Sequence, residues 1–251
     1  KSLNISLLAM NVGQQSPASI NSTRYVTTIG THTEYKTKPL YAGFNFNYQI
    51  GDDNTTGTDG KIKTVNAMNA AIDVAYTMKE KYTVGIGYEY LSGQSGTDTT
   101  KAYKNINHAF NPFFGTNHKF NGYMDYYYVG NHLNTVGLQD IFLKLKYKVE
   151  KWSLALDFHQ FMTAADVLNS KELTNTGQYK AMNGSLGSEI DLTFGYNLPG
   201  GVSLVTGYSH YLPTKTLGIV KNVKDWKGDG RTDQICNWAY IMITLKPNFL
   251  K

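Results

Sequence analysis

The stretch that decides the fold is NPFFGTNHKFNGYMDYYYVGNHLNTVGLQDIFLKLKYK, residues 111–148. Its second half alternates between two kinds of side chain, as a β-strand with two different faces does. One face carries Ile141, Leu143, Leu145, Tyr147 and Val149, and the other carries Asp140, Phe142, Lys144, Lys146 and Lys148. Such a strand can pack its apolar face on a core, or it can turn that face to lipid and its charges to a wet lumen.

The rest of the chain repeats this pattern and predicts an all-β protein. Tyr, Gly, Asn and Thr are abundant and Pro is scarce, which favours strands and turns over helices. We predict ten strands, at residues 2–12, 23–35, 39–51, 65–78, 82–92, 137–149, 151–162, 188–198, 202–212 and 235–246. Their lengths suit a tilted membrane crossing better than the five or six residues typical of soluble sheets.

The connections between these strands alternate between long and short. The short ones are 36–38, 79–81, 150 and 199–201, and the long ones are 13–22, 52–64, 93–136, 163–187 and 213–234. Short turns at one end and long loops at the other are typical of antiparallel up-and-down barrels in outer membranes. We therefore predict a single transmembrane β-barrel domain over residues 1–251, or the C-terminal portion of one, with a long loop at 93–136.

Composition excludes other classes of protein. No run of 18 apolar residues is present and the mean hydropathy is −0.36, which excludes a transmembrane helix. The net charge is +5, but the basic residues are scattered and only Arg24 and Arg231 are arginines, so we expect no nucleic-acid binding. The single cysteine, Cys236, allows no internal disulfide. The chain begins at Lys1 and enters a strand at once, so we expect a mature protein or a piece of a longer one.

If the apolar faces point to lipid, the charged residues must line the pore, because a charge at the lipid mid-plane costs about 2–4 kcal/mol. The predicted pore-lining residues are Arg24, Asp73, Glu89, Asp140, Lys144, Lys146, Lys148, Asp157, Glu189 and Asp191. Their mixed signs predict a polar and weakly selective pore. Lys144, Lys146 and Lys148 form a ladder on one strand, which is the best candidate contact for anions.

The 93–136 connection is too long and too aromatic to be a plain loop. Residues 110–128 hold eight Phe and Tyr side chains, which would be costly in water. We expect this loop to fold inward or over the mouth and to narrow the channel, with His118, Lys119 and Asp125 bonding within it. The alternative is that it packs on neighbouring loops.

One part of this loop resembles a known family. The run His118-Lys119-Phe120-Asn121-Gly122-Tyr123-Met124-Asp125, followed by Gly137-Leu138-Gln139-Asp140, resembles the H-K-x-x-G-x-x-D and G-L-x-D motifs of the alginate-export family of outer-membrane β-barrels. The resemblance implies a porin-like barrel of about eighteen strands, of which this chain would supply the C-terminal ten. It also implies that the barrel carries an anionic polysaccharide or another solute.

These observations predict an outer-membrane channel of the alginate-export or porin type in a Gram-negative bacterium, passing polar solutes or oligosaccharides passively. The expected partners are outer-membrane lipid, a polar solute or anionic saccharide, and other outer-membrane proteins. A structural or interaction barrel within a larger assembly is the alternative, and a barrel enzyme is a third. No arrangement of side chains that would activate a nucleophile is visible, so we predict no enzyme, no catalytic residues, no metal site and no cofactor.

Overall fold

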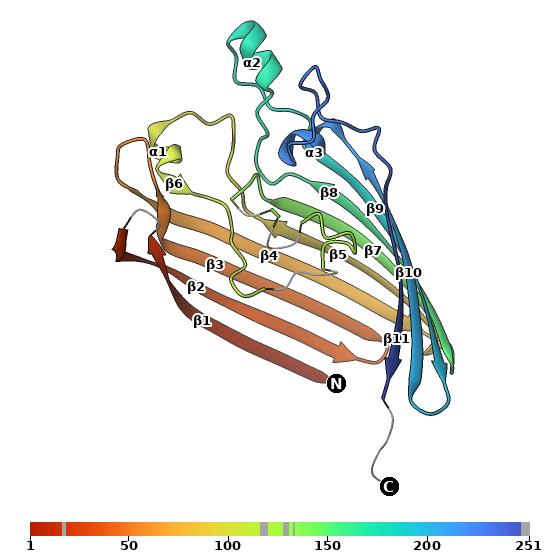
Figure 1. The fold of residues 1–251 in the computed structure, drawn as a ribbon. Coiled ribbons are helices and arrows are strands. Elements are labelled where there is room, and N and C mark those ends of the chain that lie inside the picture. The colour runs from red at the N-terminus through yellow and green to blue at the C-terminus, as the bar shows by residue number, and fades with distance from the viewer. Residues whose placement is uncertain (17–18, 116–119, 128–130, 133, 247–251) are drawn as a thin grey trace.

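The computed structural model describes residues 1–16, 19–115, 120–127, 131–132 and 134–246. Ten long strands form one antiparallel sheet in which each strand pairs with the next along the chain (Figure 1). They are β1 (Ser2–Ser16), β2 (Ser19–Thr37), β3 (Leu40–Thr56), β4 (Ile62–Met78), β5 (Tyr82–Leu91), β7 (Leu138–Lys148), β8 (Trp152–Met162), β9 (Ser185–Leu198), β10 (Val202–Pro213) and β11 (Cys236–Leu245). The eleventh, β6 (Ile106–Asn107), is a two-residue strand that pairs in parallel with β4.

The predicted fold class is confirmed: the chain is nearly all β, antiparallel and up-and-down, and the ten predicted strands are the ten long strands of the sheet. The sheet curls into a trough, as Figure 1 shows, but it does not close. Within the described residues, β1 and β11 form the two edges and are not paired with each other.

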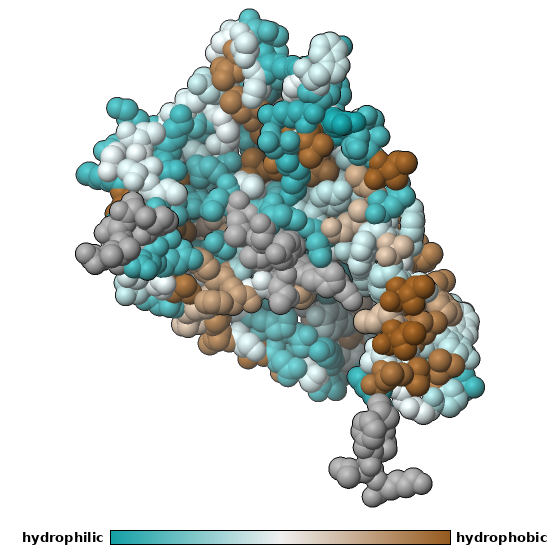
Figure 2. Space-filling view, viewed as in Figure 1, coloured by the Kyte–Doolittle hydropathy of each residue, from teal (hydrophilic) through white to brown (hydrophobic). Residues whose placement is uncertain are grey.

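The two faces of the sheet differ as the alternation predicts. On the convex face, large apolar side chains are exposed on every long strand, among them Ile5, Ile29, Phe44, Ile72, Ile86, Leu143, Leu156, Leu192, Tyr208 and Ile243. Figure 2 shows such apolar side chains gathered over β11, whereas the loops at the opposite end are hydrophilic. An exposed apolar belt of this kind is typical of a wall that faces lipid.

Aromatic side chains form a row on the convex face beside the short turns. Tyr82 stacks on Tyr147 with ring centroids 4.7 Å apart, and Tyr147 meets the edge of Trp152 at 5.1 Å. The rings come from the ends of β5, β7 and β8, which places them at one level of the wall. Amphipathic rings at one level suit a membrane–water interface.

The long connections carry the few helices, which the sequence analysis did not predict. They are α1 (Lys101–Lys104), α2 (Ser170–Thr176) and α3 (Lys215–Val220), each with a Thr or Asn side chain accepting a hydrogen bond at its start. No helix in the described part of the chain is both long and apolar enough to span a bilayer.

One predicted connection is wrong. Residues 13–22 are not a long loop, because β1 and β2 stay paired as far as Gln15 and Thr23 and begin again at Ser16 and Ser19. Gly13 lies opposite Tyr25, and a Cβ there would come within 2.9 Å of the tyrosine ring. The glycine therefore marks a place where an aromatic ring covers the strand, and it does not mark a turn.

Candidate functional site: the trough and its inward loop

The trough is lined by polar and charged side chains that alternate with the apolar residues of the convex face. Every predicted pore-lining residue lies on this face: Arg24 on β2, Asp73 on β4, Glu89 on β5, Asp140, Lys144, Lys146 and Lys148 on β7, Asp157 on β8, and Glu189 and Asp191 on β9. The structure divides them into two zones. The acids nearest the long loops are covered, and the lysines nearest the short turns are open.

The covered zone consists of four acids and one histidine on four neighbouring strands, and we call it the acid row. Its members are Glu89, Asp140, His159, Glu189 and Asp191. Strand pairing brings Glu89 opposite Asp140 and His159 opposite Glu189. Asp140 and Glu189 are 0% exposed, and Asp191 is 2% exposed. These three side chains are therefore buried, and their role in lining a pore is still a prediction.

The connection at 93–136, which we call the inward loop, covers the acid row directly. The Asn121 amide donates to Glu89 Oε2 at 2.8 Å and to Asp140 Oδ2 at 3.3 Å. The backbone N–H of Met124 donates to Glu189 Oε1 at 2.8 Å. Gly122, with φ +79°, lies so close to Glu189 that a Cβ would come within 2.5 Å of its carboxylate. The loop thus supplies hydrogen-bond donors to three buried acids, two bonds from the Asn121 side chain and one from the Met124 backbone.

Further bonds hold the loop at one side of the trough. Asn111 and Gln49 of β3 exchange two hydrogen bonds, from Asn111 N to Gln49 Oε1 at 2.9 Å and from Gln49 Nε2 to Asn111 O at 2.6 Å. Phe110 is buried beside Val26, Val65 and Ala67 of the neighbouring strands. The loop is therefore fixed to the β2–β4 side of the sheet before it crosses to the other side.

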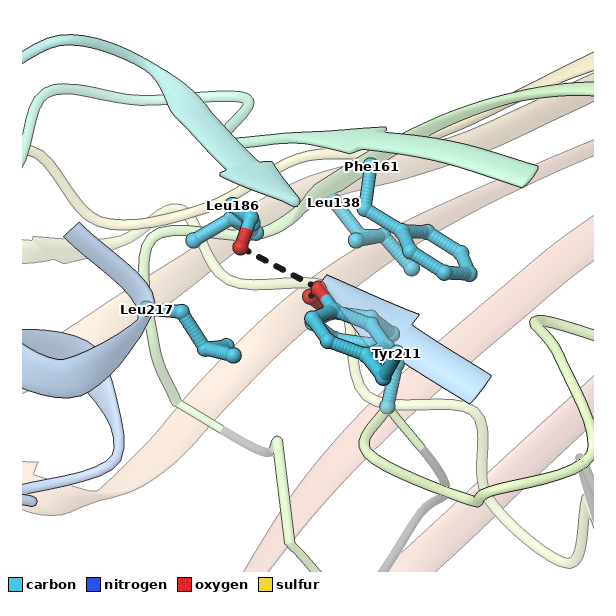
Figure 3. Close-up of a cluster of buried hydrophobic side chains, with 6 residues drawn as sticks. Leu138, Phe161, Leu186, Tyr211 and Leu217 are labelled. Carbon is cyan, nitrogen blue, oxygen red and sulfur yellow. Dashed lines mark hydrogen bonds between the residues drawn. The ribbon is translucent and has the colours of Figure 1, made fainter. Parts of the chain in front are cut away.

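On the β9–β10 side, the loop enters a buried aromatic cluster. Tyr127 packs with Leu138, Phe161, Leu186, Tyr211 and Leu217. Figure 3 shows Tyr211 beneath Leu186 and Phe161, with its hydroxyl donating to Leu186 O at 3.2 Å. The hydroxyls of Tyr127 and Tyr211 are also hydrogen-bonded to each other. Burial raises the pKa of the Tyr127 hydroxyl well above its usual value, so the hydroxyl stays neutral.

Lys221 and His132 join this side of the loop to the segment after α3. The Lys221 ammonium donates to Asn131 O at 2.9 Å and to Tyr126 O. Its distance to His132 Nδ1 is 3.4 Å, and His132 Nε2 lies 3.0 Å from Gly137 O. These partners require the proton of a neutral His132 to be on Nε2. Burial lowers the pKa of Lys221 to about 8, and burial together with the Lys221 charge lowers the pKa of His132 to about 4.

The open zone holds the lysine ladder. Lys144, Lys146 and Lys148 point into the trough, Lys144 opposite Asp157 of β8 and the other two opposite Ala155 and Ser153. Lys146 and Lys148 are exposed and Lys144 is half-buried, with its ammonium 4.8 Å from the centre of the Phe142 ring. The charge of the open zone is therefore mainly positive near the short turns.

The predicted constriction residues are described only in part. His118 and Lys119 lie outside the described residues. Asp125 lies in the loop with φ +56°, and its backbone carbonyl accepts a hydrogen bond from Asn131 Nδ2. The sequence analysis missed Asn121, Gly122 and Met124, which contact the acid row. Asn121 and Gly122 stand out among the aromatic residues of the loop, which indicates a special role for them. The local sequence does not show which residues they contact.

A second feature missed from the sequence is a buried carboxylate–imidazole pair. His159 Nδ1 lies 2.8 Å and 3.0 Å from the two oxygens of Asp140, and the exposed fraction of His159 is 1%. His159 Nε2 has no hydrogen-bond partner among the described residues, and neither do the two carboxylate oxygens of Asp191. The Asp140 carboxylate therefore fixes the orientation of the His159 ring, and the ring lies buried with Nε2 covered by protein.

Comparison with known proteins adds little to this geometry. No family model and no curated protein matches the chain. A solved structure, the outer-membrane expressed OmpT of Vibrio cholerae, is similar with a TM-score of 0.38 and 10% sequence identity. The likeness covers 88% of this chain and 59% of that one, so the chain spans less than two thirds of the length of that protein.

The prediction that the chain is not an enzyme is corrected. It rested on the absence of any catalytic arrangement of side chains, and the structure contains one element of such an arrangement, the buried Asp140–His159 pair.

Proposed function

We propose that this chain forms wall and constriction of an outer-membrane channel of the alginate-export or porin type, passing polar solutes or oligosaccharides passively across the outer membrane of a Gram-negative bacterium. The observation that carries the proposal is the contrast between the faces of the sheet. The convex face exposes apolar side chains on every long strand, and the trough carries the charges. Outer-membrane channels have this arrangement, because the lumen is wet and the outside is lipid.

The inward loop supports a gated or narrowed channel in preference to an open one. It is bonded to β3, β5, β9 and β10, so it crosses the trough from one side to the other. Its hydrogen bonds to the carboxylates of Glu89 and Glu189 contribute about 1.5–3 kcal/mol each, and those to Gln49 and Tyr211 contribute about 0.5–1.5 kcal/mol each. The loop therefore narrows the path at the level of the acid row. The lysine ladder, which is nearer the short turns, stays exposed in the trough.

The experiment is conductance of the purified protein in a planar lipid bilayer, with and without residues 108–130. We expect the deletion to raise single-channel conductance, because it removes the segment that covers the acid row. Deletion of residues 170–176, which form α2 in another loop, is the matched control and should leave conductance near that of the wild type. Equal conductance for wild type and the 108–130 deletion rejects the constriction, and the absence of channels in both rejects the channel.

The Asp140–His159 pair favours a barrel hydrolase as a second candidate. A carboxylate that fixes His159 prepares the ring to take a proton from water or from a hydroxyl once the loop that covers the acid row is displaced. The test is hydrolysis of a peptide and an ester library by wild type and by His159→Ala, with conductance measured on both. Loss of hydrolysis with unchanged conductance supports the enzyme, and equal hydrolysis by both proteins rejects it.

A further inference from the structure

The connection between β10 and β11 carries a small hairpin that the proposed channel does not use. Lys224 bridges to Gly230, the N–H of Asp225 donates to Asp229 O at 2.8 Å, and the N–H of Gly228 donates to Asp225 O at 3.0 Å. Asp225 Oδ1 accepts two more backbone N–H groups, those of Lys227 at 2.9 Å and Asp229 at 2.8 Å. The hairpin is thus fixed by its own backbone and by one aspartate, as in an Asx turn.

Trp226 stands at the tip of this hairpin. Its exposed fraction is 89%, and the Lys227 ammonium lies 4.9 Å from the centre of its ring. An indole ring is among the largest apolar surfaces a side chain can bury, so its exposure on a rigid turn is unfavourable unless something covers it. The ring is presented in one place by a fixed backbone, which reduces the entropy lost on binding.

A pocket of about 560 Å³ lies beside Trp226. Its charged lining consists of three cations, Lys215, Lys224 and Arg231, and three acids, Asp225, Asp229 and Asp233, so the charges cancel. Arg231 donates to both oxygens of Asp233, at 3.0 Å and 2.9 Å, and Asp229 is paired with Lys171 of α2 at 2.7 Å. These two ion pairs neutralise Arg231, Asp233 and Asp229, and Lys215, Lys224 and Asp225 lie beside them in the pocket wall.

What the pocket offers is an aromatic plate beside a dense set of hydrogen-bond donors and acceptors. Paired charges can each bond a hydroxyl without losing their own neutralisation, and a guanidinium next to a carboxylate matches two adjacent hydroxyl groups. A pyranose ring has the complementary surface, because its C–H groups form an apolar face and its hydroxyls surround the rim. A flat apolar ligand would have no hydrogen-bonding groups to offer the six charged side chains.

We propose that the pocket at Trp226 binds a neutral saccharide ring, with the sugar face on the indole and the hydroxyls on the Arg231–Asp233 pair and on the separate side chains of Lys215 and Asp225. The inference rests on the proposed function in taking a saccharide as the solute, but the pocket lies on the loop beyond the wall. Binding there concentrates the solute at the channel mouth. The site can therefore be tested without any measurement of transport.

The test is calorimetric titration of the intact protein in detergent with maltohexaose, cellohexaose and mannohexaose, and with an oligogalacturonate as an acidic comparison. We expect at least one neutral hexaose to bind, Trp226→Ala to weaken its binding at least tenfold, and Arg231→Ala to weaken it as well. Trp226 is exposed, so its replacement should not disturb folding, which a thermal melt checks. Trp152→Phe, on the convex face of β8, is the matched control and should bind as wild type does.

Three results overturn the proposal: no binding of any neutral hexaose, binding of the oligogalacturonate alone, or unchanged binding by Trp226→Ala. Quenching by brominated lipid in nanodiscs that is present in wild type and lost in Trp226→Ala also overturns it, because the ring would then be a membrane contact. Conductance and binding of the wild-type protein separate the two ideas. Channels that conduct without binding reject the saccharide site alone, whereas binding by a protein that forms no channels rejects the proposed function alone.

Discussion

At the scale of single residues, Gly122 is the position where the inward loop approaches the acid row most closely. Gly122 and Gly60 share the same φ of +79°, but a Cβ at Gly122 would come within 2.5 Å of the Glu189 carboxylate, whereas Gly60 has open space around it. Backbone strain of about 1–2 kcal/mol is therefore common to both alanine variants. We expect Gly122→Ala to lower the free energy of unfolding by about 1–3 kcal/mol more than Gly60→Ala, from the collision alone.

Thermal melts of both variants in detergent measure this difference, and conductance shows its consequence. Displacement of the loop by Gly122→Ala should raise conductance, while Gly60→Ala should not change it. Equal melting temperatures for the two variants would mean that the loop does not rest on Glu189.

His132 makes the loop sensitive to pH. Its pKa is lowered to about 4 from an ordinary value of 6.5, first by burial and then by the Lys221 charge. The unfolded chain therefore binds more protons than the folded one between pH 4 and pH 6.5, so stability rises with pH over this window and is lost as the pH falls through it. We expect faster hydrogen exchange of the peptide that contains Met124–Tyr127 at pH 4.5 than at pH 7, after correction for intrinsic rates.

The control for this prediction is His132→Phe, which keeps a ring against Tyr127 but cannot titrate. The variant should lose most of the difference between the two pH values. The same pH dependence in the variant would assign the effect to another group and remove His132 from the argument.

At the scale of one element, β7 carries the lysine ladder, whose role as the anion contact is still a prediction. Replacing Lys144, Lys146 and Lys148 by Glu changes the charge of the open zone from positive to negative without altering a hydrogen bond recorded for these side chains. We expect the reversal potential in a salt gradient to move toward cation preference. The matched control replaces Lys79, Lys81 and Lys151 by Glu. These lysines are exposed near the short turns, and their replacement should move the reversal potential much less. A reversal potential that stays at the wild-type value would remove the ladder from selectivity.

Element by element, alternation predicts the wall well and the loops poorly. The strands β7 and β9 follow a strict period of two, and the residues predicted for each face are found there, because lipid and water on opposite sides leave no other solution. The prediction of a loop at 13–22 is wrong. Gly13 and Pro17 favour turns by local preference, but pairing with β2 extends strand β1 through Gly13. The helices α1 to α3 were not predicted because each is shorter than two turns, which leaves no period to detect.

The site was harder to predict than the wall, and the reason is the distance along the chain between its parts. Asp140 and His159 are 19 residues apart and lie on strands whose register the sequence does not state. Asn121 reaches Glu89, 32 residues earlier, and Met124 reaches Glu189, 65 residues later. Face and charge could be assigned from one strand at a time, but these contacts depend on how four strands and a loop align.

At the scale of the whole molecule, the edges β1 and β11 decide how the barrel is completed. Within the described residues they are unpaired, and Leu7 and Ile241 are 84% and 75% exposed, more than the apolar residues of inner strands such as Leu143 at 38%. Unpaired backbone in lipid costs several kcal/mol for each group, so both edges must be covered in the membrane. The trough already holds the inward loop, with Phe110 and Tyr127 buried in it, whereas barrels of about eight strands are filled by their own side chains. We therefore expect β1 and β11 to pair with other strands and not with each other.

The measurement is disulfide formation in membranes, in a Cys236→Ser background, between Leu7→Cys and a cysteine at Asn237, Ala239, Ile241 or Ile243. None of these pairs should form an internal disulfide, while Leu7→Cys with Thr31→Cys, its neighbour on β2, should form one readily. An internal disulfide from β1 to β11 would show a barrel closed on ten strands, with the loop expelled from the trough or the lumen filled by it.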